Sequence, residues 1–162
     1  MTTALPTALP TAPPAAPQLN GQIIGRAHYA TRVLLERRLA RSGLTFHQSL
    51  ALNATADQGG SATREHLVAR LTGGLKVDPP VVLAALAGLT ADGLLAEPPG
   101  EPDRLALTSR GRARQEEIRA EVAGLTARLY GDLPAEDLAA AARVLAAVTA
   151  RAEAVAEAEA AG

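Results

Sequence analysis

Apolar residues recur at helical spacing along most of the chain, and this pattern predicts a mostly α-helical protein. The first helix is expected over residues 19–41, where Ile24 and Leu39 lie on the same apolar stripe. Two more long helices are expected toward the C-terminus, over about 109–130 and 134–157. The long helices therefore enclose a central part with shorter elements.

Helix start signals mark three shorter helices in this central part. Thr45 precedes Gln48 by three positions, which is the spacing of a capping box at a helix N-terminus. Thr63 is expected to cap the next helix, because its hydroxyl can accept a hydrogen bond from a free backbone N–H of the first turn. Asp78 is expected to cap the last of the three, with Pro79 at its first position, where a missing N–H costs nothing.

Two short β-like segments follow, after Gly93 ends the last of these helices. Residues 94–97 and 104–108 flank the turn-forming stretch PPGEPD, so we expect one small β-hairpin. Three short helices followed by a hairpin is the plan of a winged helix-turn-helix, here over about residues 44–108. The predicted fold class is a mostly α winged helix-turn-helix with long terminal helices.

Composition narrows the possible classes of protein. The chain has 162 residues, of which 48% are hydrophobic and only 2% aromatic, so its core must consist mainly of Leu, Val and Ala. The absence of Cys excludes disulfides and thiolate metal sites. The basic residues are fifteen Arg and a single Lys, a bias that suggests a GC-rich bacterial genome. We expect no metal and no cofactor.

The ends of the chain differ from its middle. Residues 1–18 are rich in Pro and Ala and carry no charge, so we expect a disordered tail, and 158–162 form a second short tail. One domain is expected between them, over 19–157. The sequence contains no apolar run of the roughly 20 residues that span a bilayer and no basic start of a secretory signal, so we expect a soluble cytoplasmic protein without a membrane partner.

Three motifs in this order resemble the MarR family of bacterial transcriptional regulators. Residues 43–71 are similar to the second and third helices of that family and read GLTFHQSLALNATADQGGSATREHLVARL. Residues 86–95 (LAGLTADGLL) resemble the end of its recognition helix and the first strand of the wing. Residues 105–112 (LALTSRGR) resemble the second wing strand where it enters the fifth helix.

The resemblance implies a homodimer that binds double-stranded DNA. The terminal helices, about 19–41 and 109–157, would form the dimer, and a small ligand bound between the two parts would lower DNA affinity. A heptad seam in the last helix fits helix–helix packing between subunits, although packing within one chain remains open. The seam consists of Leu138, Ala141, Leu145, Val148, Ala152 and Val155.

Charge departs from what the resemblance implies. Residues 26–76 carry eight basic and three acidic side chains. Residues 77–103 hold the recognition helix and most of the wing, and they carry five acidic side chains and no basic one. A DNA-binding segment is expected to be basic, because the duplex attracts proteins chiefly through its phosphates. The side chains expected to face the groove cannot form bidentate hydrogen bonds with base edges. They belong to Pro80, Val81, Leu83, Ala84, Ala87 and Gly88.

Basic residues beside the helix-turn-helix and the wing still offer a route to DNA through its phosphates. An alternative that remains open is that they are ordinary solvated charges. The candidate DNA-binding residues are Arg64, Arg70, Lys76, Arg104 and Arg110, together with Pro80, Val81 and Ala84 on the recognition helix.

The candidate ligand site combines the few aromatic and His residues of the first two helices. Arg32 could bind a carboxylate, His28 and His47 could bind its oxygens, and Phe46 could form an apolar wall, with Tyr29 adjacent. Acid–base chemistry by these His residues remains open, although the sequence has no nucleophile motif and we name no catalytic residue. A satisfied core His and a surface Arg are the plainer interpretation.

We therefore expect a ligand-responsive, DNA-binding regulator of MarR type. One alternative is a dimer of the same fold that no longer reads DNA and binds, or acts on, a small molecule in the cleft. A third interpretation is that the apolar helix face docks another protein.

Overall fold

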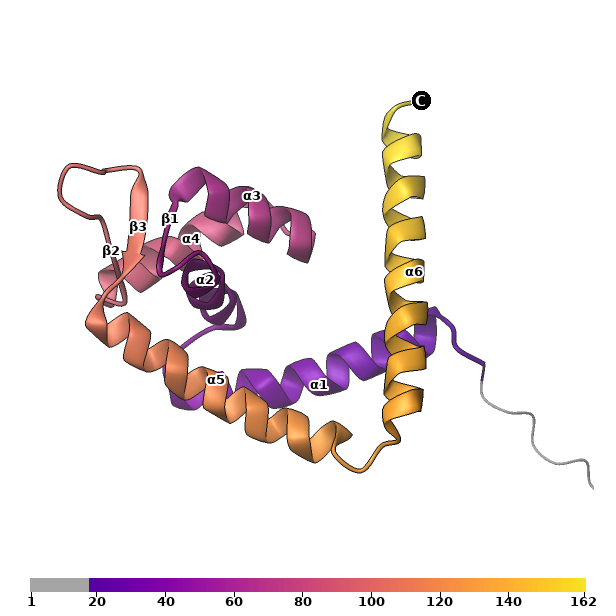
Figure 1. The fold of residues 1–162 in the computed structure, drawn as a ribbon. Helices are drawn as coiled ribbons and strands as arrows, with labels where there is room; N and C mark the ends of the chain where they lie inside the picture. The colour runs from indigo at the N-terminus through magenta and orange to yellow at the C-terminus, as the bar shows by residue number, and fades with distance from the viewer. Residues whose placement is uncertain (1–17) are drawn as a thin grey trace, which may run out of the picture.

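The computed structural model describes residues 18–162, and these form six helices and a small three-stranded sheet (Figure 1). The helices are α1 (Gly21–Arg41), α2 (Phe46–Asp57), α3 (Arg64–Leu75), α4 (Pro79–Ala91), α5 (Ser109–Tyr130) and α6 (Ala135–Ala160). The strands are β1 (Ser61–Thr63), β2 (Leu95–Ala96) and β3 (Arg104–Leu107). The predicted tail at 1–18 lies, except for Gln18, outside the described residues. At the other end α6 continues to Ala160, past the predicted end at 157.

The elements form one lobe and a set of long helices. In Figure 1, α2, α3, α4 and the sheet lie together, α1 and α5 run beneath them, and α6 rises from the far end of α5. No residue of α6 is buried, so this helix contributes nothing to the core of the chain. The predicted mostly α winged helix-turn-helix is confirmed.

The core consists of aliphatic side chains, mainly leucines, from every element of the lobe. Leu52 of α2, Leu67 of α3, Leu86 of α4 and Leu105 of β3 are fully buried in one cluster. Ile118 of α5 belongs to the same cluster, so the long helix packs against the lobe. The core is therefore aliphatic, as the shortage of aromatic residues required.

The three predicted cap residues are all N-caps, and two of them form cap hydrogen bonds with their side chains. Thr45 Oγ1 accepts a hydrogen bond from the Gln48 backbone N at 3.2 Å, and Gln48 Oε1 accepts one from the Thr45 backbone N at 2.9 Å, which completes the capping box. Thr63 Oγ1 accepts a hydrogen bond from the His66 backbone N at 3.2 Å. Both helices therefore begin where their start signals indicated.

Asp78 is the N-cap of α4 as predicted, with Pro79 after it, but the cap is formed without the side chain. Asp78 occupies the N-cap position, but its carboxylate accepts no cap hydrogen bond. The reason lies in the next residues: Pro80 has no N–H to donate, and the Val81 N–H donates instead to the backbone carbonyl of Asp78 at 3.0 Å. Asp78 thus starts α4 through its backbone conformation alone.

The wing contains one strand more than the predicted hairpin. β1 pairs antiparallel with β3, opposite Leu105 and its neighbours, so the strand order is β1-β3-β2. The predicted hairpin does not include this segment, because three residues are too few to show the alternation of a strand. Gly59 and Gly60 have φ values of 74° and 90°, and the Leu107 N–H donates to the Gly60 carbonyl at 2.8 Å. The strand therefore follows a glycine turn that is itself bonded to β3.

A tight junction joins the wing to α5. Thr108 Oγ1 accepts a hydrogen bond from the Gly111 N at 2.9 Å and donates one to the Gly93 carbonyl at 2.8 Å. A Cβ at Gly111 would overlap the carbonyl of Leu94. The first turn of α5 therefore packs directly on the segment that follows α4, and this fixes the wing relative to the long helix.

Candidate nucleic-acid interface and ligand groove

The outer face of α4 is apolar and exposed, as the sequence pattern predicted. Val82, Leu86 and Leu89 point into the core. Pro80, Val81, Leu83, Ala84 and Ala87 form the exposed face. Gly88 was expected on that face but does not belong to it. It is half-buried, and a Cβ there would lie 2.7 Å from Gln48 Nε2. Position 88 therefore faces α2, where a larger side chain would meet the capping residue.

Two of the candidate DNA-binding cations are held by carboxylates of the wing. Arg64 Nη2 lies 2.8 Å from Glu97 Oε1, and Arg104 Nε lies 2.7 Å from Glu101 Oε2. All four side chains are partly exposed. Both guanidinium groups at the wing thus have an internal anionic partner.

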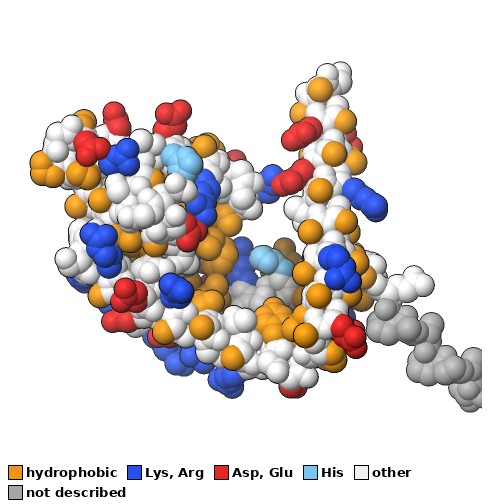
Figure 2. Space-filling view, viewed as in Figure 1, with side chains coloured by type: hydrophobic (Ala, Val, Ile, Leu, Met, Phe, Trp, Pro, Cys, Tyr) orange, Lys and Arg blue, Asp and Glu red, His pale blue; other side chains and the backbone are white. Residues whose placement is uncertain are grey.

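The remaining candidates are also engaged by acceptors of the same chain. Arg70 Nη2 lies 2.7 Å from Asp57 Oδ2, and Lys76 Nζ lies 3.1 Å from a carboxylate of α6. Arg110 Nη1 donates a hydrogen bond to the Asp92 carbonyl at 2.9 Å. Figure 2 shows acidic and basic side chains side by side on the face of the lobe, rather than a continuous basic surface.

Three of the five candidate ligand residues line one groove between α1 and α5. His28 and Arg32 lie there with Phe46, which lies at the start of α2. The Arg32 guanidinium carbon lies 4.6 Å from the centroid of the Phe46 ring, a cation–π contact, and Arg32 Nε donates to Glu36 Oε1 at 2.8 Å. A planar cation and an aromatic ring therefore lie together at the edge of a groove with apolar walls.

The other two candidates lie outside this groove. Tyr29 is 68% exposed, and its ring packs edge-to-face with that of His28, with the centroids 5.5 Å apart. His47 packs its ring edge-on against Phe46, with the ring centroids 5.7 Å apart. The sequence reasoning missed the far wall, which α5 provides. The signal for this wall in the sequence is the helical spacing of the apolar residues Val122, Leu125 and Leu129, beside which Thr126 and Tyr130 also line the groove.

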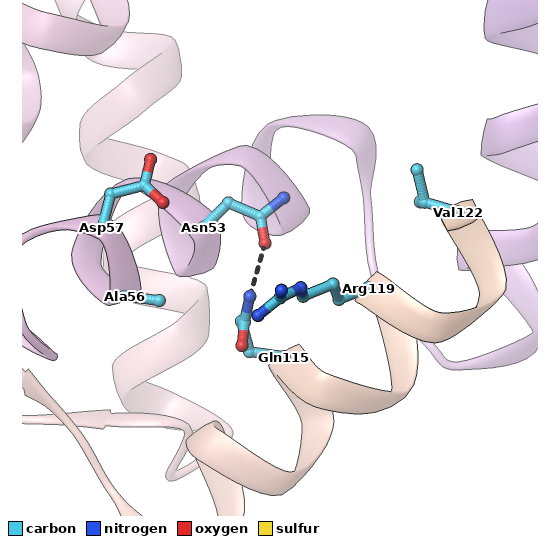
Figure 3. A pocket seen from close by; sticks show the side chains of 6 residues that line it. All are labelled: Asn53, Ala56, Asp57, Gln115, Arg119 and Val122. Atoms are coloured by element: carbon cyan, nitrogen blue, oxygen red, sulfur yellow. Dashed lines mark hydrogen bonds between the residues drawn. The ribbon is translucent and has the colours of Figure 1, made fainter. Parts of the chain in front are cut away.

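A second cavity, of about 530 Å³, lies between α2 and α5 (Figure 3). Asn53 and Gln115 line this cavity, and Gln115 Nε2 donates a hydrogen bond to Asn53 Oδ1 at 3.1 Å. In Figure 3 the Arg119 side chain extends along α5 toward this pair. Among residues 18–162 no carboxylate lies within ion-pair distance of Arg119. The sequence reasoning did not single out these residues.

Within the described part of the chain, the His, Asp and Glu side chains form no group of three or more that could bind a metal ion. Across the same residues, no helix has both the length and the apolar character needed to cross a bilayer.

No family model matches the sequence, and no curated protein matches it either. Solved structures do match the fold. Sco5413, a MarR family transcriptional regulator from Streptomyces coelicolor, is 21% identical, with a TM-score of 0.67 over 82% of this chain and 91% of that one. BpsR of Bordetella bronchiseptica is 24% identical, with a TM-score of 0.65 over 80% of this chain and 97% of that one.

A MarR family protein of Mycobacterium tuberculosis, solved in complex with p-aminosalicylic acid, is also 24% identical. Its TM-score is 0.63, over 82% of this chain and 99% of that one. These proteins share their fold with the chain at sequence identities of 21% to 24%. The chain therefore has the fold of the MarR family of transcriptional regulators.

Proposed function

We propose that the protein is a ligand-responsive, DNA-binding transcriptional regulator that acts as a homodimer in the cytoplasm. The observation that carries the proposal is that α4 lies beside the wing (Figure 1) with an exposed outer face, while the guanidinium groups of Arg64 and Arg104 lie at the wing. In a winged helix-turn-helix this is the helix that enters the major groove. Its apolar side chains can contact thymine methyl groups, while the cations bind phosphates.

The long helices support the homodimer. α6 has no buried residue, and its predicted seam residues Leu145, Val148 and Val155 are 40%, 43% and 57% exposed. Ile23 and Val33 of α1 are exposed as well. Such apolar faces are covered in stable proteins, and a second copy of the chain would supply matching helices.

The groove between α1 and α5 supports a small aromatic acid as the ligand. Arg32 can bind a carboxylate, and the ring of Phe46 beside it can stack on an aromatic ligand. Two proteins of the same fold fit this choice: one is solved with p-aminosalicylic acid, and the DNA binding of the other is regulated by 6-hydroxynicotinic acid. Both are aromatic acids of similar size.

Fluorescence anisotropy with labelled duplexes from the DNA upstream of its own gene tests the proposal. We expect sequence-specific binding that weakens steeply as salt rises, because phosphate contacts release counterions. Arg64→Ala combined with Arg104→Ala should weaken binding at least tenfold. The matched control is Arg143→Ala combined with Arg151→Ala, which removes two charges from α6. If the protein does not bind DNA even at low salt, the proposal of a DNA-binding regulator is contradicted. The alternative that then remains is a dimer of the same fold that binds, or acts on, a small molecule.

A further inference from the structure

We propose that two wing carboxylates, Glu97 and Glu101, restrain DNA binding by holding Arg64 and Arg104 in internal ion pairs. This inference rests on the proposed function and adds the residues that set its affinity. It follows from the pairing of both wing cations with carboxylates of the same wing, on the face where phosphates would bind.

The first pair connects α3 to the wing. Arg64 is the first residue of α3, and its backbone N donates to the Asp103 carbonyl at 2.7 Å, which fixes it beside the wing. From there its guanidinium reaches Glu97, the residue that follows β2. The Arg64 side chain is 35% exposed and that of Glu97 is 46% exposed. A DNA phosphate approaching Arg64 therefore meets Glu97 as well.

The second pair is local to the wing loop. Arg104 begins β3, and its backbone N donates to the Glu101 carbonyl at 3.0 Å while its side chain binds the Glu101 carboxylate. The loop thus holds both ends of the pair in place. Residues 77–103 contain five acidic side chains and no basic one, so no other cation of this segment offsets the carboxylates.

The strength of the two Arg–Glu ion pairs determines how far they weaken DNA binding. Exposed ion pairs are weak, so a phosphate can displace the carboxylate. The displaced carboxylate then remains close to the phosphate and repels it. The pairs therefore weaken DNA binding. They also lower its salt dependence, because an arginine that already has an anionic partner releases fewer counterions from the DNA.

The test compares two charge-matched variants of the full chain with the wild type. Glu97→Gln combined with Glu101→Gln frees both cations, whereas Glu136→Gln combined with Glu159→Gln makes the same charge change on α6. We expect the first variant to bind the upstream duplex about tenfold more tightly, since each exposed pair accounts for a factor of up to about five. For this variant, the plot of log binding constant against log salt concentration should have a slope that is steeper by about one to two. The control should stay within about twofold of the wild type by the same argument.

A double-mutant cycle separates pairing from general charge. Glu97→Gln should increase affinity several times more in the wild type than in an Arg64→Ala background, where no cation is released. Equal gains in both backgrounds, or an unchanged affinity of the double Gln variant while the wild type binds, would overturn the inference and leave the regulator intact. If the double Gln variant binds DNA and the wild type does not, the restraint by the wing carboxylates is supported. The proposal that the wild-type protein binds DNA is then contradicted. If neither protein binds at low salt, both proposals fail.

Discussion

Lys76 Nζ lies 3.1 Å from Glu153 Oε1, so an ion pair joins the end of α3 to α6. Lys76 is also the C-cap of α3 in a left-handed conformation, with φ 53° and ψ 44°. Among the described residues it is the one non-glycine with positive φ. Both side chains are largely exposed, so the pair contributes less than about 1 kcal/mol to folding. Its importance lies in what it joins, the proposed DNA-binding lobe and the proposed dimer helix.

Replacing Lys76 separates its backbone strain from its charge. We expect Lys76→Gly to raise the free energy of unfolding by about 0.5 to 1 kcal/mol, because glycine adopts this conformation without a steric cost. Lys76→Ala keeps the strain and removes the same charge. Both variants should bind DNA several times more weakly. Urea denaturation and anisotropy check this, and a Gly variant less stable than the Ala variant would contradict the role of the backbone.

Two glycines of α5 should respond oppositely to the same substitution. Gly111→Ala should destabilise the protein by about 2 to 4 kcal/mol, because its Cβ would overlap the carbonyl of Leu94 and force α5 away from the wing. Gly124→Ala should stabilise it by up to about 1 kcal/mol, since nothing lies within 4 Å of that Cβ and alanine favours a helix interior. Thermal and chemical denaturation measure both, and equal effects would show that the junction is not tightly packed.

Arg32 should determine the affinity for aromatic acids. In a thermal-shift assay with p-aminosalicylate as the probe, we expect Arg32→Ala to abolish most of the ligand-induced rise in Tm, because it removes the cation beside Phe46. Arg37→Ala, which removes an exposed charge from the same helix, is the control. Tyr29→Ala should also leave the shift unchanged, since Tyr29 does not line the groove. An equal shift in wild type and Arg32→Ala would contradict the proposed ligand site.

Local signals in the sequence were sufficient for most of the fold. The capping box of Thr45 and Gln48 acts within one turn, and the core positions Val82, Leu86 and Leu89 follow from the helical period alone. These features depend on residues close together in the chain. The element order of a winged helix-turn-helix followed from such signals.

Features that depend on distant residues were not predictable in the same way. β1 exists only because it pairs with β3, more than forty positions further along the chain. Arg64 could be named as a candidate, but its partner Glu97 depends on how the wing folds back on α3. The ligand groove likewise needed α5 as its second wall, and Tyr29 and His47 could not be separated from His28 without it. The sequence therefore predicted only some of the residues that form the candidate DNA-binding and ligand sites.

The seam of α6 should decide the oligomeric state. We expect Leu145→Asp combined with Val148→Asp to convert a dimer into a monomer, because two charges would be buried without partners in a helix–helix interface. Ala146→Asp combined with Ala150→Asp places the same charges on the same helix away from the seam. Sedimentation velocity at micromolar concentration distinguishes the two states.

The consequence for DNA binding follows from the geometry of a dimer. One copy of α4 contacts one half-site, so the monomeric variant should lose at least about a hundredfold in affinity for a two-half-site duplex, because it loses the benefit of simultaneous binding. The control variant should bind as the wild type does. A wild-type chain that sediments as a monomer, or a Leu145→Asp/Val148→Asp variant that remains dimeric, would show that α6 does not form the subunit interface.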